Sequence, residues 1–127
     1  MGLVVGVVAI AVSGCVGYGL YPPPPGQPET VDIKLLEFSI DAWPRLFRKG
    51  RVIFDVTNAG AYEHSLVLVG GKVQETLAED LAAGEHTKAS VELPSGTYRL
   101  LCPDSNHAKV GMTADLDAVD AAAWFRR

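Results

Sequence analysis

Apolar and β-branched residues recur along the chain in short runs that glycine, proline and asparagine separate. Seven runs beyond residue 30 have the length and composition of β-strands. They cover residues 31–40, 51–57, 64–69, 72–77, 87–93, 96–102 and 111–116. No apolar period of helical length lies between them to supply the crossovers that parallel strands require. The pattern therefore predicts an all-β fold, an antiparallel β-sandwich of about seven to eight strands.

Two segments depart from this pattern. We expect a helical turn at residues 77–83, which are rich in alanine, leucine and acidic residues. The Ala-rich end, residues 117–127, fits either a short helix or a frayed terminus.

The first fifteen residues form an apolar run without a charged side chain. The run is shorter than the roughly 20 residues that a membrane-spanning helix needs, and its end, Val-Ser-Gly-Cys at residues 12–15, resembles the lipobox of bacterial lipoprotein signals. We expect residues 1–15 to be a signal peptide, and a lipid on Cys15 to anchor the protein extracytoplasmically, on the periplasmic or cell-surface side of the cell envelope membrane. A signal peptide normally has a positively charged residue before its apolar run, but no Lys or Arg precedes this one. Either the true start lies upstream of Met1, or the segment is a plain secretory signal or a frayed terminus.

Residues 16–30 are rich in glycine and proline, with consecutive prolines at 22–25. Proline has no N–H to donate to a strand ladder and favours the extended polyproline II conformation. We expect this segment to be a tether between the membrane and a folded domain at residues 31–127.

Length and charge limit the possible functions. A chain of 127 residues suffices for one domain with a proper core but not for two of ordinary size. The net charge of -4 and the absence of a basic block argue against a nucleic-acid partner. No nucleophile has a neighbouring base, and no carboxylate cluster suits a hard metal. We therefore expect a monomer that is not an enzyme.

The stretch that carries chemistry joins the last two predicted strands. It contains Cys102, His107 and Met112 in a Cys-x4-His-x4-Met spacing, and thiolate, imidazole and thioether are soft or borderline metal ligands. His64, at the start of another strand, can supply a second imidazole. Two nitrogens and a thiolate in a trigonal array, with a weak axial thioether, form a blue-copper electron-transfer site.

Each of these residues also has a purely structural alternative. Cys102 is the only cysteine that remains if Cys15 is lipidated, so it is either a buried inert thiol or a metal ligand. Met112 alone fits a core position, and His64 alone fits a surface or hydrogen-bonded histidine. We expect His86, which lies in a polar turn, to face solvent.

The ligand residues and their flanks resemble the cupredoxins, the family of small blue-copper proteins that includes plastocyanin, azurin, rusticyanin and sulfocyanin. The resemblance rests on residues 50–66 and 93–99, together with Cys102, His107 and the Gly-Met pair at 111–112. It covers roughly residues 31–119. The length of the ligand loop is similar to that of the rusticyanin and sulfocyanin type.

The resemblance implies a Greek-key β-sandwich that binds one copper ion, which alternates between Cu(I) and Cu(II). His64 and His107 then bind the ion through imidazole nitrogen, Cys102 through its thiolate and Met112 as the axial ligand. Ser65 occupies a position that is polar in many cupredoxins, where it ties the two ligand-bearing segments together by hydrogen bonds. An ordinary strand residue is the alternative for Ser65.

The implied function is one-electron transfer between a donor and an acceptor redox protein at the cell envelope. The exposed edge of His107 would pass the electron, with Pro103, Ala108 and Val110 as an apolar docking rim. Two alternatives are a copper-binding or copper-delivery protein, which needs weaker and more exposed ligands, and a cupredoxin-like interaction module without electron transfer. A binuclear copper centre needs a second cysteine in the loop, and a multicopper oxidase needs His-x-His pairs. The sequence contains neither.

Overall fold

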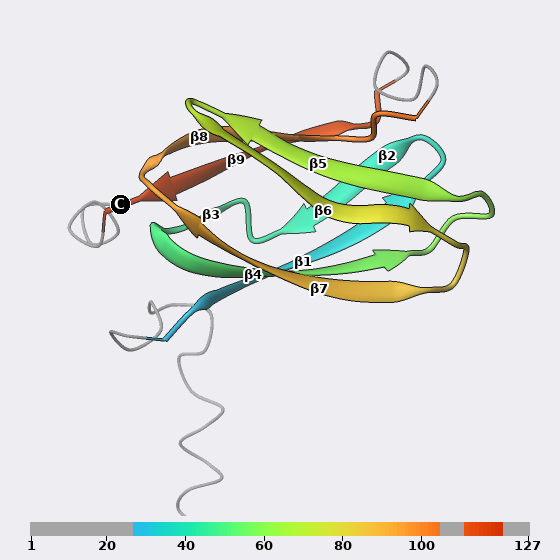
Figure 1. The fold of residues 1–127 in the computed structure, drawn as a ribbon, viewed down its shortest axis with the longest axis horizontal. Coiled ribbons are helices and arrows are strands. Elements are labelled where there is room, and N and C mark those ends of the chain that lie inside the picture. The colour runs from blue at the N-terminus through green and yellow to red at the C-terminus, as the bar shows by residue number, and fades with distance from the viewer. Residues whose placement is uncertain (1–26, 105–110, 121–127) are drawn as a thin grey trace, which may run out of the picture.

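The computed structural model describes residues 27–104 and 111–120, and in this part of the chain nine strands form two sheets that face each other (Figure 1). The four-stranded sheet contains β1 (Glu29–Leu36), β2 (Ser39–Trp43), β4 (Gly50–Asn58) and β7 (His86–Leu93), in the order β2-β1-β4-β7. The five-stranded sheet contains β3 (Leu46–Arg48), β5 (His64–Gly70), β6 (Val73–Leu81), β8 (Gly96–Leu101) and β9 (Thr113–Val119), in the order β3-β9-β8-β5-β6. The predicted all-β sandwich is confirmed.

The number and the limits of the strands differ from the prediction. The run predicted at 31–40 is a hairpin of β1 and β2 around a turn at Glu37 and Phe38, and the three-residue β3 was not predicted. The helical turn expected at 77–83 is wrong, because β6 continues as a strand to Leu81. At the C-terminal end, β9 continues through Val119. The remainder of that segment at 121–127, like the proposed signal and nearly all of the tether, lies outside the described residues.

Both sheets are mixed rather than purely antiparallel. β1 pairs with β4, and β3 with β9, in parallel, whereas the other neighbours are antiparallel. After β1 the chain turns back through β2, visits the other sheet in β3 and returns, so that β4 runs in the direction of β1. From β4 the chain crosses to the β5–β6 hairpin and comes back to pair β7 with β4. A last strand that returns beside the first is the Greek-key connection.

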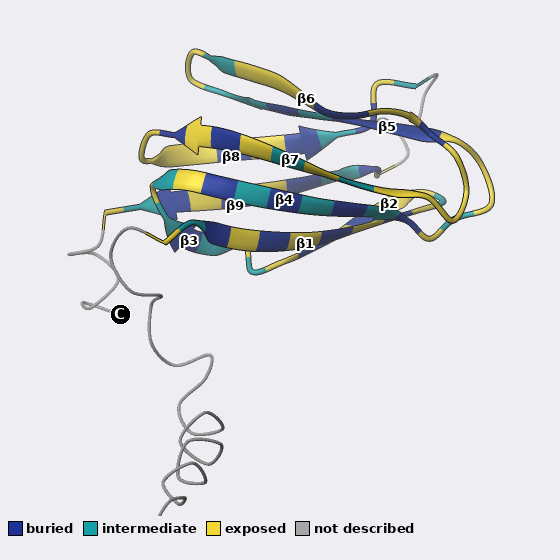
Figure 2. Cartoon of the chain, turned by 60° about the horizontal axis from the view of Figure 1, so that its bottom comes forward, coloured by how far each residue is buried: buried dark blue, intermediate teal, exposed yellow. Residues whose placement is uncertain are grey.

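Buried and exposed residues alternate along the strands (Figure 2), and the buried side chains form the core between the two sheets. Successive side chains of a strand point to opposite faces of its sheet. Val31, Ile33 and Leu35 of β1 face inward, and the aromatic side chains of Phe47 and Phe54 are fully buried among them. In residues 27–104 and 111–120, no helix is long and apolar enough to cross a membrane.

Candidate metal centre

Strand alternation turns three of the predicted ligands inward at the same end of the sandwich. His64 lies two residues before the buried Leu66 of β5, Cys102 lies two residues after the buried Leu100 of β8, and Met112 lies two residues before Ala114 of β9. Cys102 directly follows β8 and Met112 directly precedes β9, so all three residues keep the inward parity of the adjoining strand. Their side chains are 0%, 1% and 0% exposed, respectively.

Strand pairing then brings the three residues together. β8 pairs with β5 on one side and with β9 on the other, and the backbone N–H of Cys102 donates to the carbonyl of Met112 at 3.3 Å. Nδ1 of His64 lies 4.0 Å from Sγ of Cys102. The ladder therefore places an imidazole and a thiol, 38 residues apart in the sequence, in one buried cluster.

The spacing of the two donors fits one metal ion. With metal–nitrogen and metal–sulfur bonds of about 2.0 and 2.3 Å, as in zinc sites, two donors of one first-row ion lie at most about 4.3 Å apart. The observed 4.0 Å is within that limit. A thiol, an imidazole and a nearby thioether are also the donor types that copper prefers.

A carboxylate holds the other nitrogen of His64. Oε2 of Glu37, in the turn between β1 and β2, lies 2.8 Å from Nε2 of His64. The backbone N–H groups of Ala61 and Tyr62 also donate to this carboxylate, at 2.9 and 3.1 Å. Hydrogen bonds from Ala61 and then His64 lower the pKa of the Glu37 carboxyl. Glu37 thus joins a turn of one sheet to the loop that leads into β5 of the other.

A second carboxylate lies on the Cys102 side of the cluster. Oδ2 of Asp104 accepts a hydrogen bond from the backbone N–H of Ser65 at 3.0 Å and lies 3.7 Å from Sγ of Cys102. Burial raises the pKa of the Cys102 thiol, and backbone N–H groups of Asp104 and Ser65 act in the opposite direction by hydrogen bonding. The segments that carry His64 and Cys102 are therefore linked through Asp104.

Ser65 makes this link with its backbone, and its hydroxyl serves another purpose. Oγ of Ser65 accepts a hydrogen bond from the backbone N–H of Asp80 at 2.9 Å. Asp80 has a φ of 47° and lies where the register of β5 and β6 shifts next to His64. β-Bulges of this kind are common beside functional sites, where they change the direction of a side chain.

The loop between β4 and β5 is organised by Asn58. This residue follows Val56 on the inward face of β4 and is fully buried. Its Nδ2 donates to the carbonyls of Tyr62 and Leu81, both at 2.8 Å, and its Oδ1 accepts from Gly60 N at 3.0 Å. The amide therefore shapes the short loop that ends at His64.

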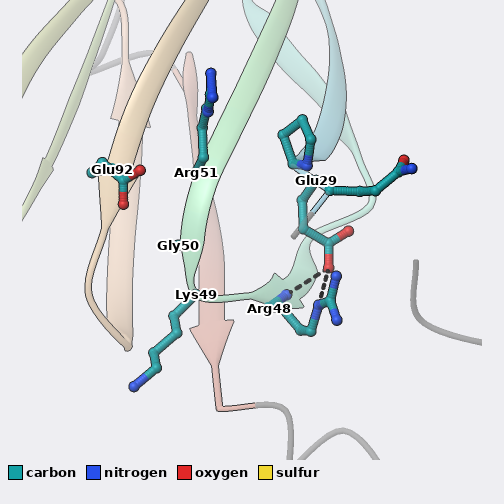
Figure 3. Close-up of a pocket in the computed structure, with 8 residues that line it drawn as sticks. Glu29, Arg48, Lys49, Gly50, Arg51 and Glu92 are labelled. Carbon is teal, nitrogen blue, oxygen red and sulfur yellow. Dashed lines mark hydrogen bonds and ion pairs between the residues drawn. The ribbon is translucent and has the colours of Figure 1, made fainter. Parts of the chain in front are cut away.

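A pocket lies at the opposite end of the sandwich, at the start of β1 and β4 (Figure 3). It has a volume of about 450 Å³. There Oε2 of Glu29 accepts from the backbone N–H of Arg48 at 2.9 Å and lies 3.5 Å from its Nε, and Arg51 faces Glu92 in the β4–β7 ladder. Opposite charges lie close together in this pocket, and it contributes nothing to the centre at His64.

Solved structures with a similar fold include auracyanins of photosynthetic bacteria. The auracyanin of the photosynthetic bacterium Roseiflexus castenholzii, reduced with dithionite, matches with a TM-score of 0.60 and 20% identity over 74% of this chain and 99% of that chain. Auracyanin A, a "blue" copper protein of Chloroflexus aurantiacus, matches with a TM-score of 0.57 and 21% identity over 72% of this chain and 99% of that one.

The chain has a cupredoxin fold.

The same fold also occurs inside a larger enzyme. A multicopper oxidase matches with a TM-score of 0.59 and 19% identity, covering 80% of this chain but only 46% of that chain. Comparisons with protein-family models and with curated protein sequences give no match. Similarity to solved structures therefore shows the fold of this chain alone.

Within the cupredoxin fold, the fourth predicted ligand lies outside the described residues. This applies to His107 and to the whole loop at 105–110, so the rusticyanin-like and sulfocyanin-like loop type stays a prediction. Among the residues that the structure does describe, no group of three or more His, Cys, Asp or Glu side chains forms a metal site. His86, on the outer surface at the start of β7, is exposed as expected.

Sequence reasoning missed Glu37, Asn58 and Asp104. The sequence contains a local signal for two of them, because alternate residues of a strand point inward. Glu37 lies two residues after the inward-facing Leu35, and Asn58 lies two residues after the inward-facing Val56. A polar residue in an inward register needs a buried partner. The identity of that partner depends on the facing sheet and could not be read from the strand alone.

Proposed function

We propose that the protein is a type 1 (blue) copper protein that carries single electrons between two redox partners at the cell envelope, and that it is not an enzyme. The observation that carries the proposal is the buried pair of His64 Nδ1 and Cys102 Sγ, 4.0 Å apart, with Met112 buried at the same end of the fold. A copper ion bound there would supply a one-electron couple, because thiolate and imidazole together accommodate both oxidation states. His107 is proposed as the fourth donor.

The way in which the chain holds these donors suits a carrier. His64 begins β5 and Cys102 directly follows the neighbouring strand β8, and Asp104 links their segments through Ser65 N. Donors that are fixed in this way need to move little when the charge of the ion changes. The described donors are at most 1% exposed, and an electron, unlike a substrate, needs no open path from solvent.

Deep burial also argues against the copper-delivery alternative. A protein that hands copper to an acceptor needs weak and accessible ligands, whereas His64, Cys102 and Met112 lie inside the core. Catalysis of the multicopper oxidase kind would need further copper ligands, and the chain has only three histidines and no His-x-His pair. Electron transfer remains the function that the residues support best.

Docking is proposed at this same end of the sandwich. Pro103 is exposed beside the site. Ala108 and Val110, the other members of the apolar rim expected from the sequence, lie outside the described residues. Two exposed aromatic residues near Glu37 are proposed as further parts of this surface. Phe38 follows Glu37 in the sequence and is 42% exposed, and Tyr62, whose backbone N–H donates to Glu37, is 66% exposed. A small apolar surface beside the copper site suits the weak, short-lived contacts of electron-transfer partners.

The proposed location is extracytoplasmic, with a lipid on Cys15 as the membrane anchor. The support is the lipobox-like end of residues 12–15 and the proline-rich segment that follows. The described domain begins at the end of the sandwich remote from His64, because β1 starts there and ends next to Glu37. A tether entering at that end would leave the docking surface pointing away from the membrane.

The test is to load the full chain with copper and to record its visible spectrum and a voltammogram. We expect an intense blue absorption and a reversible one-electron wave, and Cys102→Ser should abolish the colour while leaving the fold intact. His86→Gln serves as a control, since it removes an exposed histidine and should change neither signal. A colourless protein would contradict the proposal, and ready transfer of Cu(I) to a metal-free acceptor would favour the delivery function instead.

A further inference from the structure

Three nitrogen atoms converge on the carboxylate of Glu37. They are Nε2 of His64 at 2.8 Å, the backbone N of Ala61 at 2.9 Å and the backbone N of Tyr62 at 3.1 Å. A carboxylate only accepts hydrogen bonds, so it can serve all three donors at once. A neutral amide has one accepting oxygen and would turn its NH₂ group toward at least one of these N–H groups.

The backbone makes room for this carboxylate at Gly60. A Cβ atom at this position would overlap with Oε2 of Glu37 and would lie 2.8 Å from Cδ of the same side chain. The φ angle of Gly60 is outside the left-handed region that favours glycine, so the requirement for glycine is steric. A glycine at this position therefore leaves space for the carboxylate beside His64.

We propose that Glu37 is the positioning residue of the metal centre: its carboxylate keeps the ring proton of His64 on Nε2, directs Nδ1 toward Cys102, and disfavours reduction of the bound ion through its negative charge. This inference rests on the proposed copper function for its last part only. The first two parts concern the metal-free chain.

The proton on Nε2 matters because only an unprotonated ring nitrogen can bind a metal. Nδ1 is the nitrogen that faces Cys102, at 4.0 Å, so the proton has to reside on Nε2. Histidine ligands generally donate their other N–H to a carboxylate, a carbonyl or water, which fixes the ring orientation and raises ligand basicity. Here the acceptor is a charged group that is itself held by two backbone amides, and its side chain is only 23% exposed.

The negative charge has a separate consequence. The oxidised ion carries one more positive charge than the reduced ion, so a nearby anion stabilises the oxidised form more and lowers the reduction potential. Asp104 contributes charge from the Cys102 side. Removing the charge of Glu37 should therefore raise the potential even where the hydrogen bond to His64 survives.

Four variants of the full chain separate these effects. Glu37→Ala removes the acceptor and the charge, whereas Glu37→Gln keeps an accepting oxygen and removes the charge. Gly60→Ala keeps the charge but displaces the carboxylate from His64 by overlap. Glu63→Gln is the matched control, because Glu63 is exposed and precedes His64 directly in the sequence.

The first measurement uses metal-free protein labelled with ¹⁵N at histidine, in which NMR distinguishes the two ring tautomers. We expect a single tautomer with the proton on Nε2 in the wild type, in Glu37→Gln and in Glu63→Gln. We expect a mixture of both tautomers in Glu37→Ala and Gly60→Ala. Retention of the single tautomer in both of these variants would overturn the positioning role.

The second measurement is copper affinity and reduction potential. Loss of a group that orients a ligand typically costs about 10- to 100-fold in metal affinity, which we expect for Glu37→Ala and Gly60→Ala, with a smaller loss for Glu37→Gln. The reduction potential should rise in Glu37→Gln and stay unchanged in Glu63→Gln. If Glu37 had a purely structural role, the potential would stay unchanged in both variants. An unchanged potential in Glu37→Gln would refute the charge effect. If the wild type itself binds no copper, the proposed function fails, while the tautomer experiment still decides the role of Glu37.

Discussion

Replacing Asn58 by alanine tests the local structure that delivers His64 to the centre. Asn58 lies at an inward position of β4 and is fully buried. Its side chain makes hydrogen bonds with the carbonyls of Tyr62 and Leu81 and with the backbone N–H of Gly60, at 2.8, 2.8 and 3.0 Å. Alanine removes all three bonds and leaves their backbone partners inside the protein.

The structure gives an estimate of the loss. A typical intramolecular hydrogen bond contributes a net free energy of about 0.5–1.5 kcal/mol, so three of them amount to about 1.5–4.5 kcal/mol. The bond to Leu81 is buried and the other two are partly buried, so water can replace some of the lost partners but not all. We therefore expect Asn58→Ala to lower the free energy of unfolding by about 3 kcal/mol.

The measurement is equilibrium unfolding of the metal-free protein in urea. The midpoint should fall while the slope of the unfolding free energy against urea stays the same, because a pure change in stability leaves that slope unaltered. Asn58→Asp should be at least as damaging, since it directs a charged oxygen at the carbonyls of Tyr62 and Leu81. Gln74→Ala removes an exposed amide on β6 and should change the stability by no more than about 0.5 kcal/mol.

A loss below about 0.5 kcal/mol for Asn58→Ala would refute the reasoning. It would mean that the amide does not hold the loop, and that the backbone alone places His64. A loss in the expected range, accompanied by weaker copper binding, would connect the stability of this loop to the function of the centre.

Three further predictions concern the axial ligand, the core and the anchor. Met112→Leu nearly conserves volume and should cost less than about 1.5 kcal/mol of stability. Removal of the thioether donor should nevertheless favour Cu(I) and raise the reduction potential. An unchanged or lowered potential in voltammetry would contradict the role of Met112 as axial ligand. Gly70→Ala would bring a Cβ to 2.5 Å from Cδ1 of Tyr98 and 2.7 Å from the carbonyl of Thr97, and we expect a loss of about 1–3 kcal/mol in thermal unfolding, with full stability as the contrary result. Cys15→Ala should release the protein from the membrane fraction or leave it uncleaved, because acyl chains contribute roughly 0.8 kcal/mol per buried methylene; a soluble, unmodified wild-type product would disprove the anchor.

The sequence by itself determined the fold class and the inward face of the candidate ligands. Both depend on short-range regularities: strands are runs of apolar and β-branched residues, and alternate residues share a face. His64, Cys102 and Met112 each lie two residues from a buried residue of β5, β8 or β9, so their parity is visible in the sequence. The spacing from Cys102 to Met112 likewise placed both residues on one connection between adjacent strands, β8 and β9.

Local propensity was misleading where partner strands decided the outcome. Residues 77–83 are rich in the best helix formers, alanine, leucine and glutamate, and a helical turn was expected. In the fold, Ala78 and Leu81 pair with Leu66 and His64 of β5 and are buried. Burial and the ladder with β5 outweigh an intrinsic preference that is worth only tenths of a kcal/mol per residue.

Only the tertiary structure decided what surrounds the candidate ligands. Glu37 is 27 residues from His64 in the sequence and lies on the other sheet, and it reaches the imidazole because the two sheets pack face to face at this end. The space left by Gly60 and the amides of Ala61 and Tyr62 complete its surroundings. A period along one strand says which way a side chain points, but the group it meets there is set by the packing of strands that are distant in the chain.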